Sequence, residues 1–296
     1  MRVGGPHYFA YPAFIANGYL DVSYPDHLDS TAPEDGLWQD GYDWHRWPGT
    51  TAVYVPYNQI LTSPGQVKDE GGEYPFSDQG FVGGVETVDG NSVFAFPFKG
   101  HDMYELESFT GKKSYFFFDN MVVCLGTNIT SGIKDYQVET TILQNKITKE
   151  GKLLTSNGEI NKFPYSQTIE KTKPLWMLDH RGTGYFIPEV PAGAKLKIQS
   201  ETQTNPQYQN KGSLKGDFST VLFDHGKASQ NVSYNYAVVF NTNQKDMETF
   251  TSEMNSKNQP YKILSETEKA HIVKSSKNAT TAYAIYDESA VLKKGG

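Results

Sequence analysis

The segment from Asp43 to Thr51 holds the side chains of this chain that are best suited to chemistry. It places two tryptophans, a histidine and an arginine directly before Pro48 and Gly49. Proline fixes its own φ and disfavours helix at the preceding residue, and glycine lets the chain bend sharply. The segment therefore predicts a rigid bend that presents aromatic faces and a guanidinium. The alternative is the start of a β domain with surface aromatics and a structural ion pair.

Four residues of this bend are candidates for substrate contact. The planar fork of Arg46 suits a carboxylate or a sulfate. The rings of Trp44 and Trp47 suit the faces of sugars, and a core role for one of the two is the alternative. His45 would either contact the substrate or cap the bend.

The composition indicates a large β-rich chain. Its 296 residues suffice for one large all-β domain or two smaller ones. Tyrosine and phenylalanine are frequent, with 19 and 17 copies, and both favour strands. The net charge of −7 and the scattered lysines and arginines argue against a nucleic-acid partner. Cys124, the one cysteine, lies in an apolar run and is interpreted as a buried, inert thiol.

No part of the sequence predicts a membrane span or a signal peptide. No apolar run reaches the roughly 18 residues that a spanning helix needs. The N-terminal residues lack a basic region followed by an apolar core.

Short strands separated by turns dominate the sequence after Thr51. Such a pattern predicts stacked antiparallel sheets. A short helix at most is expected within Phe9–Leu20, a loop from Tyr24 to Gly41, and one further helix at Met247–Ser256. His101–Phe109 is expected to continue the sheet. The other expected strands are Gly83–Glu86, Ser92–Pro97, Lys112–Phe118, Met121–Asn128, Tyr136–Asn145, Leu175–Leu178, Gly184–Ile187, Ala194–Ser200, Ser219–Phe223, Tyr234–Asn241, Pro260–Leu264, Ala270–Lys274 and Thr281–Tyr286.

Several motifs occur in a fixed order along the chain. They are Trp44–Thr51, Lys112–Asp119, Val122–Ile129, Val138–Thr141, Gly184–Pro188, Asp224–Gly226, Tyr234–Tyr236 and Lys269–Val273. Together they resemble family 8 of the polysaccharide lyases, which includes chondroitin AC and ABC lyases, hyaluronate lyase and xanthan lyase. The similarity is nearest to the chondroitin sulfate ABC lyases and covers nearly the whole chain.

The resemblance implies a mainly β fold, with a large antiparallel, galactose mutarotase-like β-sandwich and the start of a smaller C-terminal β domain. Residues 1–45 are then expected to form a linker from a helical toroid that this chain lacks. Residues 46–252 would form the sandwich, and residues 258–296 part of the C-terminal domain. Both ends are expected to be cuts within a longer architecture. By resemblance, the location is extracellular or periplasmic.

The resemblance also implies part of a glycosaminoglycan lyase that cleaves a uronic-acid polysaccharide by β-elimination. Chondroitin or dermatan sulfate is the expected partner, with hyaluronan as a further candidate. A base removes the C5 proton, which is acidic only if the adjacent carboxylate is neutralised, and an acid protonates the O4 leaving group. The family takes a histidine and a tyrosine for these steps from its helical domain, often with an asparagine facing the carboxylate. None has a motif match here, and His7, Tyr8 and Tyr11 are not assigned these roles.

Two catalytic residues carry over from the family by their motifs. Arg46 would hold the catalytic tyrosine and the glycosidic-oxygen side of the substrate, and keep the pKa of the phenol low. Glu139 would orient that arginine and tyrosine; its alternative is a solvated charge on a strand face. Because the chain is acidic, an anionic polymer needs a local positive cleft, for which Arg46 with Lys99, Lys112 or Lys113 is the candidate.

The remaining polar residues favour no further site. His180 and His225 are interpreted as turn residues. Some relatives bind Ca²⁺, but no dense loop of oxygen ligands appears, so no metal or other cofactor is predicted. The acidic residues considered are Asp78, Glu86, Asp102, Glu105 and Glu107. The competing functions are a non-catalytic carbohydrate-binding β-sandwich and a purely structural module.

Overall fold

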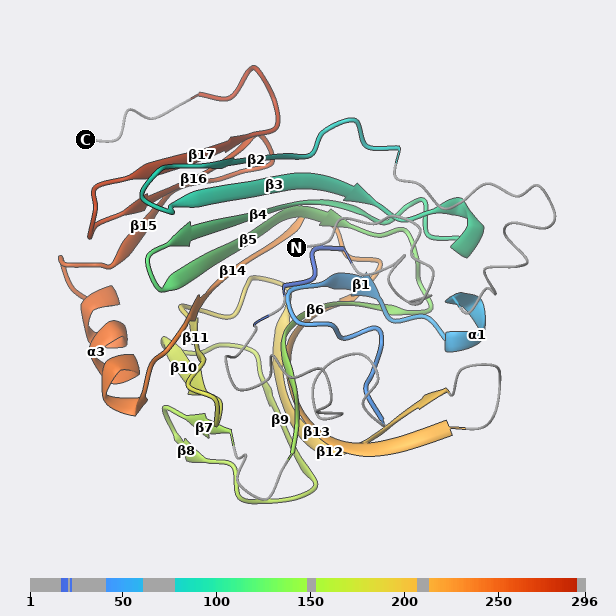
Figure 1. The fold of residues 1–296 in the computed structure, drawn as a ribbon. Helices are drawn as coiled ribbons and strands as arrows, with labels where there is room; N and C mark the ends of the chain where they lie inside the picture. The colour runs from blue at the N-terminus through green and yellow to red at the C-terminus, as the bar shows by residue number, and fades with distance from the viewer. Residues whose placement is uncertain are drawn as a thin grey trace.

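The described part of the chain consists mainly of antiparallel strands arranged in three sheets (Figure 1). The computed structural model describes residues 17–20, 22, 41–60, 78–147, 153–206 and 213–291. The first sheet has five strands. In spatial order they are β1 (Thr51–Val53), β6 (Gln137–Lys146), β13 (Ser213–Lys227), β12 (Lys195–Pro206) and β9 (Tyr165–Ile169).

The second sheet has nine strands, and the third has three. The nine are β2 (Gly83–Glu86), β3 (Ser92–Lys99), β4 (Thr110–Phe118), β5 (Met121–Thr130), β14 (Val232–Val239), β11 (Gly184–Ile187), β10 (Leu175–Leu178), β7 (Leu154–Thr155) and β8 (Gly158–Glu159). The three are β15 (Tyr261–Glu266), β16 (Ala270–Ser275) and β17 (Thr281–Ile285). The described helices are α1 (Tyr57–Ile60), α3 (Gln244–Met254) and a 3₁₀ turn at Asp102–Tyr104.

The central strands of the nine-stranded sheet, such as β5, are buried on both faces. Successive side chains of a strand point to opposite faces. In β5, Val122 and Cys124 belong to the core cluster that includes Phe223 of the five-stranded sheet. Val123 belongs to a second cluster, with Met247 of α3. This two-sided burial explains why β5 reads as a continuous apolar run.

The predicted mainly β, antiparallel sandwich is confirmed, and most expected strands lie within a few residues of their predicted bounds. The helix begins at Gln244, earlier than expected, because the Asn243 side chain caps it by accepting from the backbone N–H of Asp246. The sequence reading missed α1, β7, β8 and β9. The predicted helix within Phe9–Leu20 and the loop from Tyr24 lie mostly outside the described residues, and the domain boundaries stay predictions.

Two local predictions were wrong. His101–Phe109 holds the 3₁₀ turn, and Glu105 follows it with a φ of 57°, a backbone conformation that a strand does not use. The second concerns the expected strand Tyr136–Asn145, where the alternation of the sequence predicts Val138, Thr140 and Ile142 on one face and Glu139, Thr141 and Leu143 on the other. A register shift against β13 turns Leu143 into the core beside Ile142 instead.

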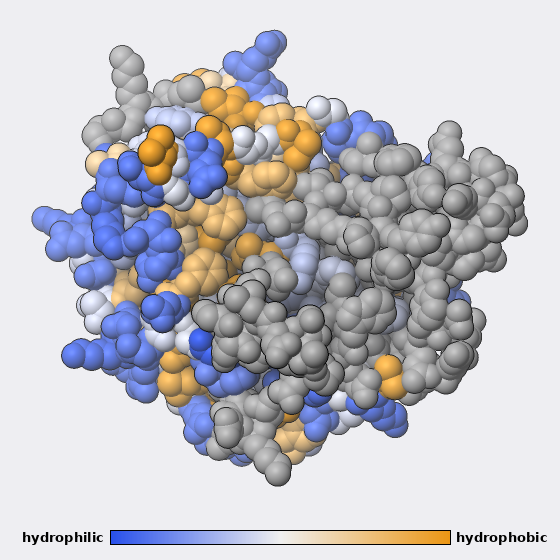
Figure 2. All heavy atoms as spheres, in the orientation of Figure 1, coloured by the Kyte–Doolittle hydropathy of each residue, from blue (hydrophilic) through white to orange (hydrophobic). Residues whose placement is uncertain are grey.

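Part of the surface is apolar. Figure 2 shows apolar side chains over the three-stranded sheet and the edge of the nine-stranded sheet, between hydrophilic regions. The exposed large hydrophobic residues of these strands and their flanks are Phe81, Val82, Val85, Val88, Tyr283 and Ile285. Among the described residues, no helix is long and apolar enough to span a membrane.

Candidate functional site

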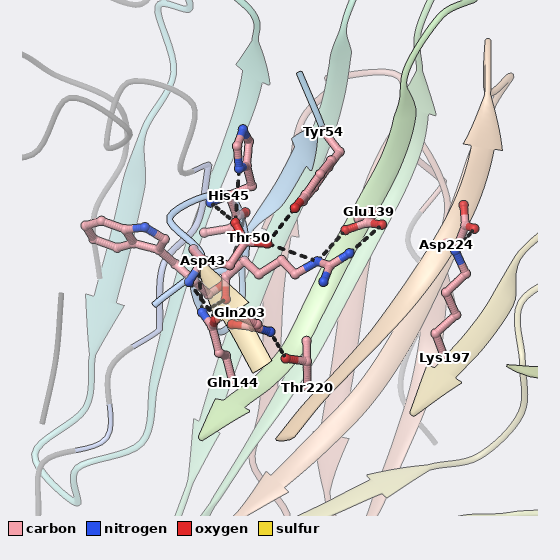
Figure 3. Close-up of polar contacts among 12 residues, drawn as sticks. Asp43, His45, Thr50, Tyr54, Glu139, Gln144, Lys197, Gln203, Thr220 and Asp224 are labelled. Carbon is pink, nitrogen blue, oxygen red and sulfur yellow. Dashed lines mark hydrogen bonds and ion pairs between the residues drawn. The ribbon is translucent and has the colours of Figure 1, made fainter. Parts of the chain in front are cut away.

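Arg46 and Glu139 form a two-pronged ion pair on the outer face of the five-stranded sheet (Figure 3). Arg46 Nε donates to Glu139 Oε2 at 2.9 Å, and Nη2 donates to Oε1 at 3.3 Å. Their side chains are only 12% and 5% exposed. The fold thus joins the two residues that the sequence selected as catalytic candidates. A planar fork of this kind fixes the direction of the guanidinium as well as its distance.

The backbone of β6 fixes the bend that carries Arg46. The Gly49 N–H donates to the Thr141 carbonyl at 2.8 Å, and the Thr141 N–H donates to the Thr50 carbonyl at 2.9 Å. These bonds lie two residues from Glu139 along β6. The bend and the glutamate are therefore positioned by the same strand.

Asp43 is a buried carboxylate at the centre of the site, and the sequence analysis did not select it. Its Oδ1 accepts from the His45 backbone N–H and lies 3.0 Å from His45 Nδ1. The phenols of Tyr54 and Tyr57 donate to it at 2.8 and 3.0 Å. Burial alone would raise the pKa of Asp43, but the His45 hydrogen bond, the charges of His45 and Arg46 and the Tyr54 bond hold it well below its usual value.

Tyr54 lies directly against the guanidinium. The Arg46 Cζ atom lies 4.7 Å from the centre of the Tyr54 ring, an arrangement favourable for a cation–π contact. Burial and the nearby Asp43 carboxylate raise the pKa of Tyr54, although Arg46 opposes the shift. Tyr54 is therefore a neutral phenol near neutral pH and does not supply a phenolate base.

Gln144 ties the start of the bend to β6. Its Oε1 accepts from the Asp43 N–H at 2.9 Å, and its Nε2 donates to the carbonyls of Asp43 and Arg46. The register shift in β6 returns this residue to the Glu139 face. Sequence alternation alone could not place it, because a bulge changes the face of every later residue.

Carboxylates surround Arg46 on several sides. In addition to Glu139, Asp43 Oδ2 lies 3.6 Å from Nε, and Glu201 Oε1 lies 3.8 Å from Nη1. Burial by itself would lower the pKa of the guanidinium, but Glu139 and Asp43 more than offset it and hold that pKa above its usual value. On the same face, Lys197 pairs with Asp224 at 2.6 Å (Figure 3).

The lysines expected to extend the positive charge of Arg46 lie elsewhere. Lys99 pairs with Asp78, and Lys112 donates to the Glu268 carbonyl. Lys113 is fully buried beneath the bend. The predicted cleft of Arg46 with these lysines was therefore wrong.

The aromatic candidates of the bend have different surroundings. Trp47 is 1% exposed and packs in a small cluster with Tyr42 and Phe218, so the core alternative describes it. Trp44 is partly exposed, and its ring packs edge-on against Tyr57. His45 is buried with its ring held by Asp43 and directed away from Glu139 (Figure 3). Substrate contact stays a prediction for Trp44 and His45.

The two histidines that were interpreted as turn residues have different surroundings. His180 is exposed in the turn that joins β10 to β11. His225 is not in a turn: it lies within β13, and its Nε2 is 2.8 Å from Thr140 Oγ1. Burial lowers the pKa of His225 to about 4, so it is neutral near pH 7.

Within the described ranges, no three histidine, cysteine, aspartate or glutamate side chains are grouped to hold a metal. The thiol of Cys124 is buried and its pKa is raised to about 12 by burial, which makes it a poor nucleophile.

The sequence matches known polysaccharide lyases along most of its length. A chondroitin sulfate ABC exolyase from Bacteroides thetaiotaomicron is 31% identical over 97% of this chain and 26% of that protein. A chondroitin sulfate ABC endolyase from Proteus vulgaris is 27% identical over 86% of this chain and 24% of that protein. The chain thus spans about a quarter of the length of these relatives.

The fold matches the same group of enzymes. The structure of a Paenibacillus xanthan lyase superposes with a TM-score of 0.68 at 20% identity, over 88% of this chain and 24% of that chain. A chondroitinase AC lyase superposes with a TM-score of 0.61 at 23% identity, over 83% of this chain and 33% of that chain. The sequence model for the super-sandwich domain of polysaccharide lyase family 8 matches residues 38–251, and this chain belongs to that family.

Proposed function

We propose that this chain is the β-sandwich part of a glycosaminoglycan lyase that cleaves a uronic-acid polysaccharide by β-elimination. The observation that carries the proposal is the fork between Arg46 and Glu139, held in place by the buried Asp43. The curated relatives include chondroitin sulfate ABC lyases, so chondroitin or dermatan sulfate is the proposed substrate class, with hyaluronan as a further candidate.

In this proposal Arg46 is an electrostatic and orienting group. A guanidinium has five N–H donors, of which Glu139 takes two. The Nη1 group makes no bond to Glu139 and lies 3.8 Å from the exposed Glu201 carboxylate; it would serve the glycosidic oxygen or a catalytic phenol. Positive charge at this point favours the negative charge that develops on the leaving oxygen. Glu139 would keep the guanidinium in that direction.

The base and the acid are assigned to a histidine and a tyrosine of an associated helical domain, as the family resemblance implies. Residues of the bend do not suit these tasks. His45 Nδ1 is bound to Asp43, and the pKa of Tyr54 is raised rather than lowered. Proton transfer would therefore need groups outside the residues described around Arg46.

The test is the ultraviolet absorbance of the unsaturated uronate, measured with the full chain on chondroitin sulfate and on hyaluronan. The assay is run with and without the helical domain of a family member added in trans. Product that depends on the helical domain and disappears in Arg46→Ala supports the proposal. Glycan retention on a chondroitin sulfate column, without product under any condition, indicates the carbohydrate-binding alternative. Neither product nor retention contradicts both.

A further inference from the structure

A buried lysine lies beneath the bend that carries Arg46. Lys113 of β4 is 0% exposed, and a buried amino group needs acceptors for its N–H donors. Its Nζ donates to the Asn17 carbonyl at 2.9 Å and to the Gly49 carbonyl. The rings of Tyr115 and Tyr234 lie 5.7 and 5.9 Å from Nζ. Among the described residues no carboxylate pairs with it, so backbone carbonyls accept its hydrogen bonds and burial lowers its pKa to about 7.

Tyr115 makes the same connection from the same strand. Its hydroxyl lies 2.5 Å from the Gly18 carbonyl and 3.0 Å from the Gly49 carbonyl, so its one proton is shared between these two acceptors. Two glycines make this approach possible. A Cβ on Gly18 would collide with the Tyr115 hydroxyl and lie 2.8 Å from Lys113 Nζ. Gly49 has a φ of +81°, which glycine adopts without strain, and its carbonyl faces Lys113 and Tyr115 of β4.

Gly49 is therefore attached to both sheets of the sandwich. Its N–H donates to Thr141 of β6, in the five-stranded sheet. Its carbonyl accepts from Lys113 and Tyr115 of β4, in the nine-stranded sheet. Arg46 precedes Gly49 by three residues; its N–H donates to the Asp43 carbonyl at 3.0 Å, and its carbonyl accepts from Gln144 at 2.9 Å. The bend is a short loop between fixed points. The direction of the Arg46 guanidinium therefore depends on the bonds that the Gly49 backbone makes to β6 and β4.

We propose that Lys113 is a positioning residue for Arg46: with Tyr115 it fixes the bend from within the sandwich and so sets the geometry of the Arg46–Glu139 fork. The inference rests on the proposed function for its catalytic meaning, but its structural content is independent of any substrate. Lys113 touches neither the substrate side of Arg46 nor Glu139 itself, so it acts through the carbonyl of Gly49.

The test measures hydrogen exchange at the Arg46 Nε–H by ¹⁵N NMR of the full chain. This proton is protected by its hydrogen bond to Glu139, so its exchange rate measures how often the Arg46–Glu139 pair opens. In Lys113→Met we expect exchange to accelerate by roughly tenfold or more, because opening of the bend needs no global unfolding. Lys112→Met, on the same strand, should change the rate by less than about twofold.

A control for lost stability separates positioning from a general structural role. Met247→Ala creates a cavity in the second core cluster, under α3 and away from the bend. It should lower the urea midpoint without changing Arg46 exchange under native conditions. Equal exchange rates in Lys113→Met and Met247→Ala would overturn the proposal.

If Lys113→Met does not fold, Tyr115→Phe replaces it, because this variant removes only the hydroxyl that reaches Gly18 and Gly49. Accelerated exchange in Tyr115→Phe supports the anchor, and an unchanged rate rejects it. A failed lyase assay would not affect this result, since no glycan is present. The two proposals can thus fail separately.

Discussion

The Tyr54 phenol donates a 2.8 Å hydrogen bond to the buried Asp43 carboxylate, and the ring of the same tyrosine lies against the Arg46 guanidinium. One side chain thus links the negative centre of the site to its positive group. Removing the hydroxyl in Tyr54→Phe leaves the ring in place and deprives a buried charge of a donor. Hydrogen bonds to charged groups contribute about 1.5–3 kcal/mol. We therefore expect the free energy of unfolding, measured by urea denaturation, to decrease by about that amount in Tyr54→Phe.

Tyr165→Phe is the matched control for this variant. Its hydroxyl donates to Gln167 at the protein surface, where water can replace the bond. A loss of less than about 0.5 kcal/mol is expected there. Equal losses in the two variants would show that Asp43 does not depend on Tyr54.

The fork predicts different consequences for the two glutamates near Arg46. Glu139 is buried and binds the guanidinium twice, whereas Glu201 is 41% exposed and lies 3.8 Å away. Under the proposed function, Glu139→Gln should lower kcat/KM by roughly 100-fold, because a loosened guanidinium loses its direction toward the transition state. Glu201→Gln should stay within a few-fold of the parent protein. Initial rates of ultraviolet product formation measure both, and similar losses would argue against a directing role for Glu139.

The sequence predicted the sheets and selected Arg46 and Glu139. It did not identify the groups that hold this ion pair in place. Alternation and turn residues located the strands because both act over a few neighbouring positions. Arg46 and Glu139 were found through their motifs. Gln144 was not identified because a bulge in β6 places it on the other face of the strand. Trp47 is a core residue because Phe218, from a strand distant in the sequence, packs against it.

Two residues near the Arg46–Glu139 pair carried a local signal: Asp43, which was not selected, and Lys113, which was assigned to a positive cleft. Asp43 precedes His45 by two positions, the spacing at which an aspartate accepts from a backbone N–H in an Asx turn. Alternation along Lys112–Phe118 places Lys113 on the same face as Tyr115, which packs in the main core. The sequence could not predict the hydrogen-bond partners of Lys113, because the carbonyls of Asn17 and Gly49 approach it only in the folded chain.

The buried Lys113 predicts a rise in stability with pH above neutrality. Burial lowers its pKa from 10.5 to about 7 in the folded protein. Between these values the unfolded chain binds a proton that the folded chain does not, so the free energy of unfolding increases as the pH rises. The slope contributed by this one group approaches about 1.4 kcal/mol per pH unit. Urea denaturation at a series of pH values from 7 to 9 measures it.

Lys113→Met should remove this slope, and Lys112→Met should retain it. The groups that surround Lys113 do not titrate in the same window of the folded protein. Burial raises the pKa of Tyr115 and Tyr234 well above 10 and that of Cys124 to about 12, and lowers that of His225 to about 4. An unchanged slope in Lys113→Met would mean that the lysine keeps its ordinary pKa in the fold.

The last prediction separates two costs at Gly49. An alanine there must adopt a φ near +81°, which costs about 1–2 kcal/mol for an L residue. Its Cβ would also lie 2.8 Å from the Gly18 carbonyl oxygen and from Leu20 Cβ. Gly90→Ala is the matched control, since its φ is +79° but no atom lies within 4 Å of the added Cβ. The free energy of unfolding should therefore fall by about 1 kcal/mol in Gly90→Ala and by clearly more in Gly49→Ala, because crowding adds to backbone strain. Equal losses in urea denaturation would show that the bend can move away from Gly18 without cost, and would weaken the view that the backbone around Arg46 is held in one position.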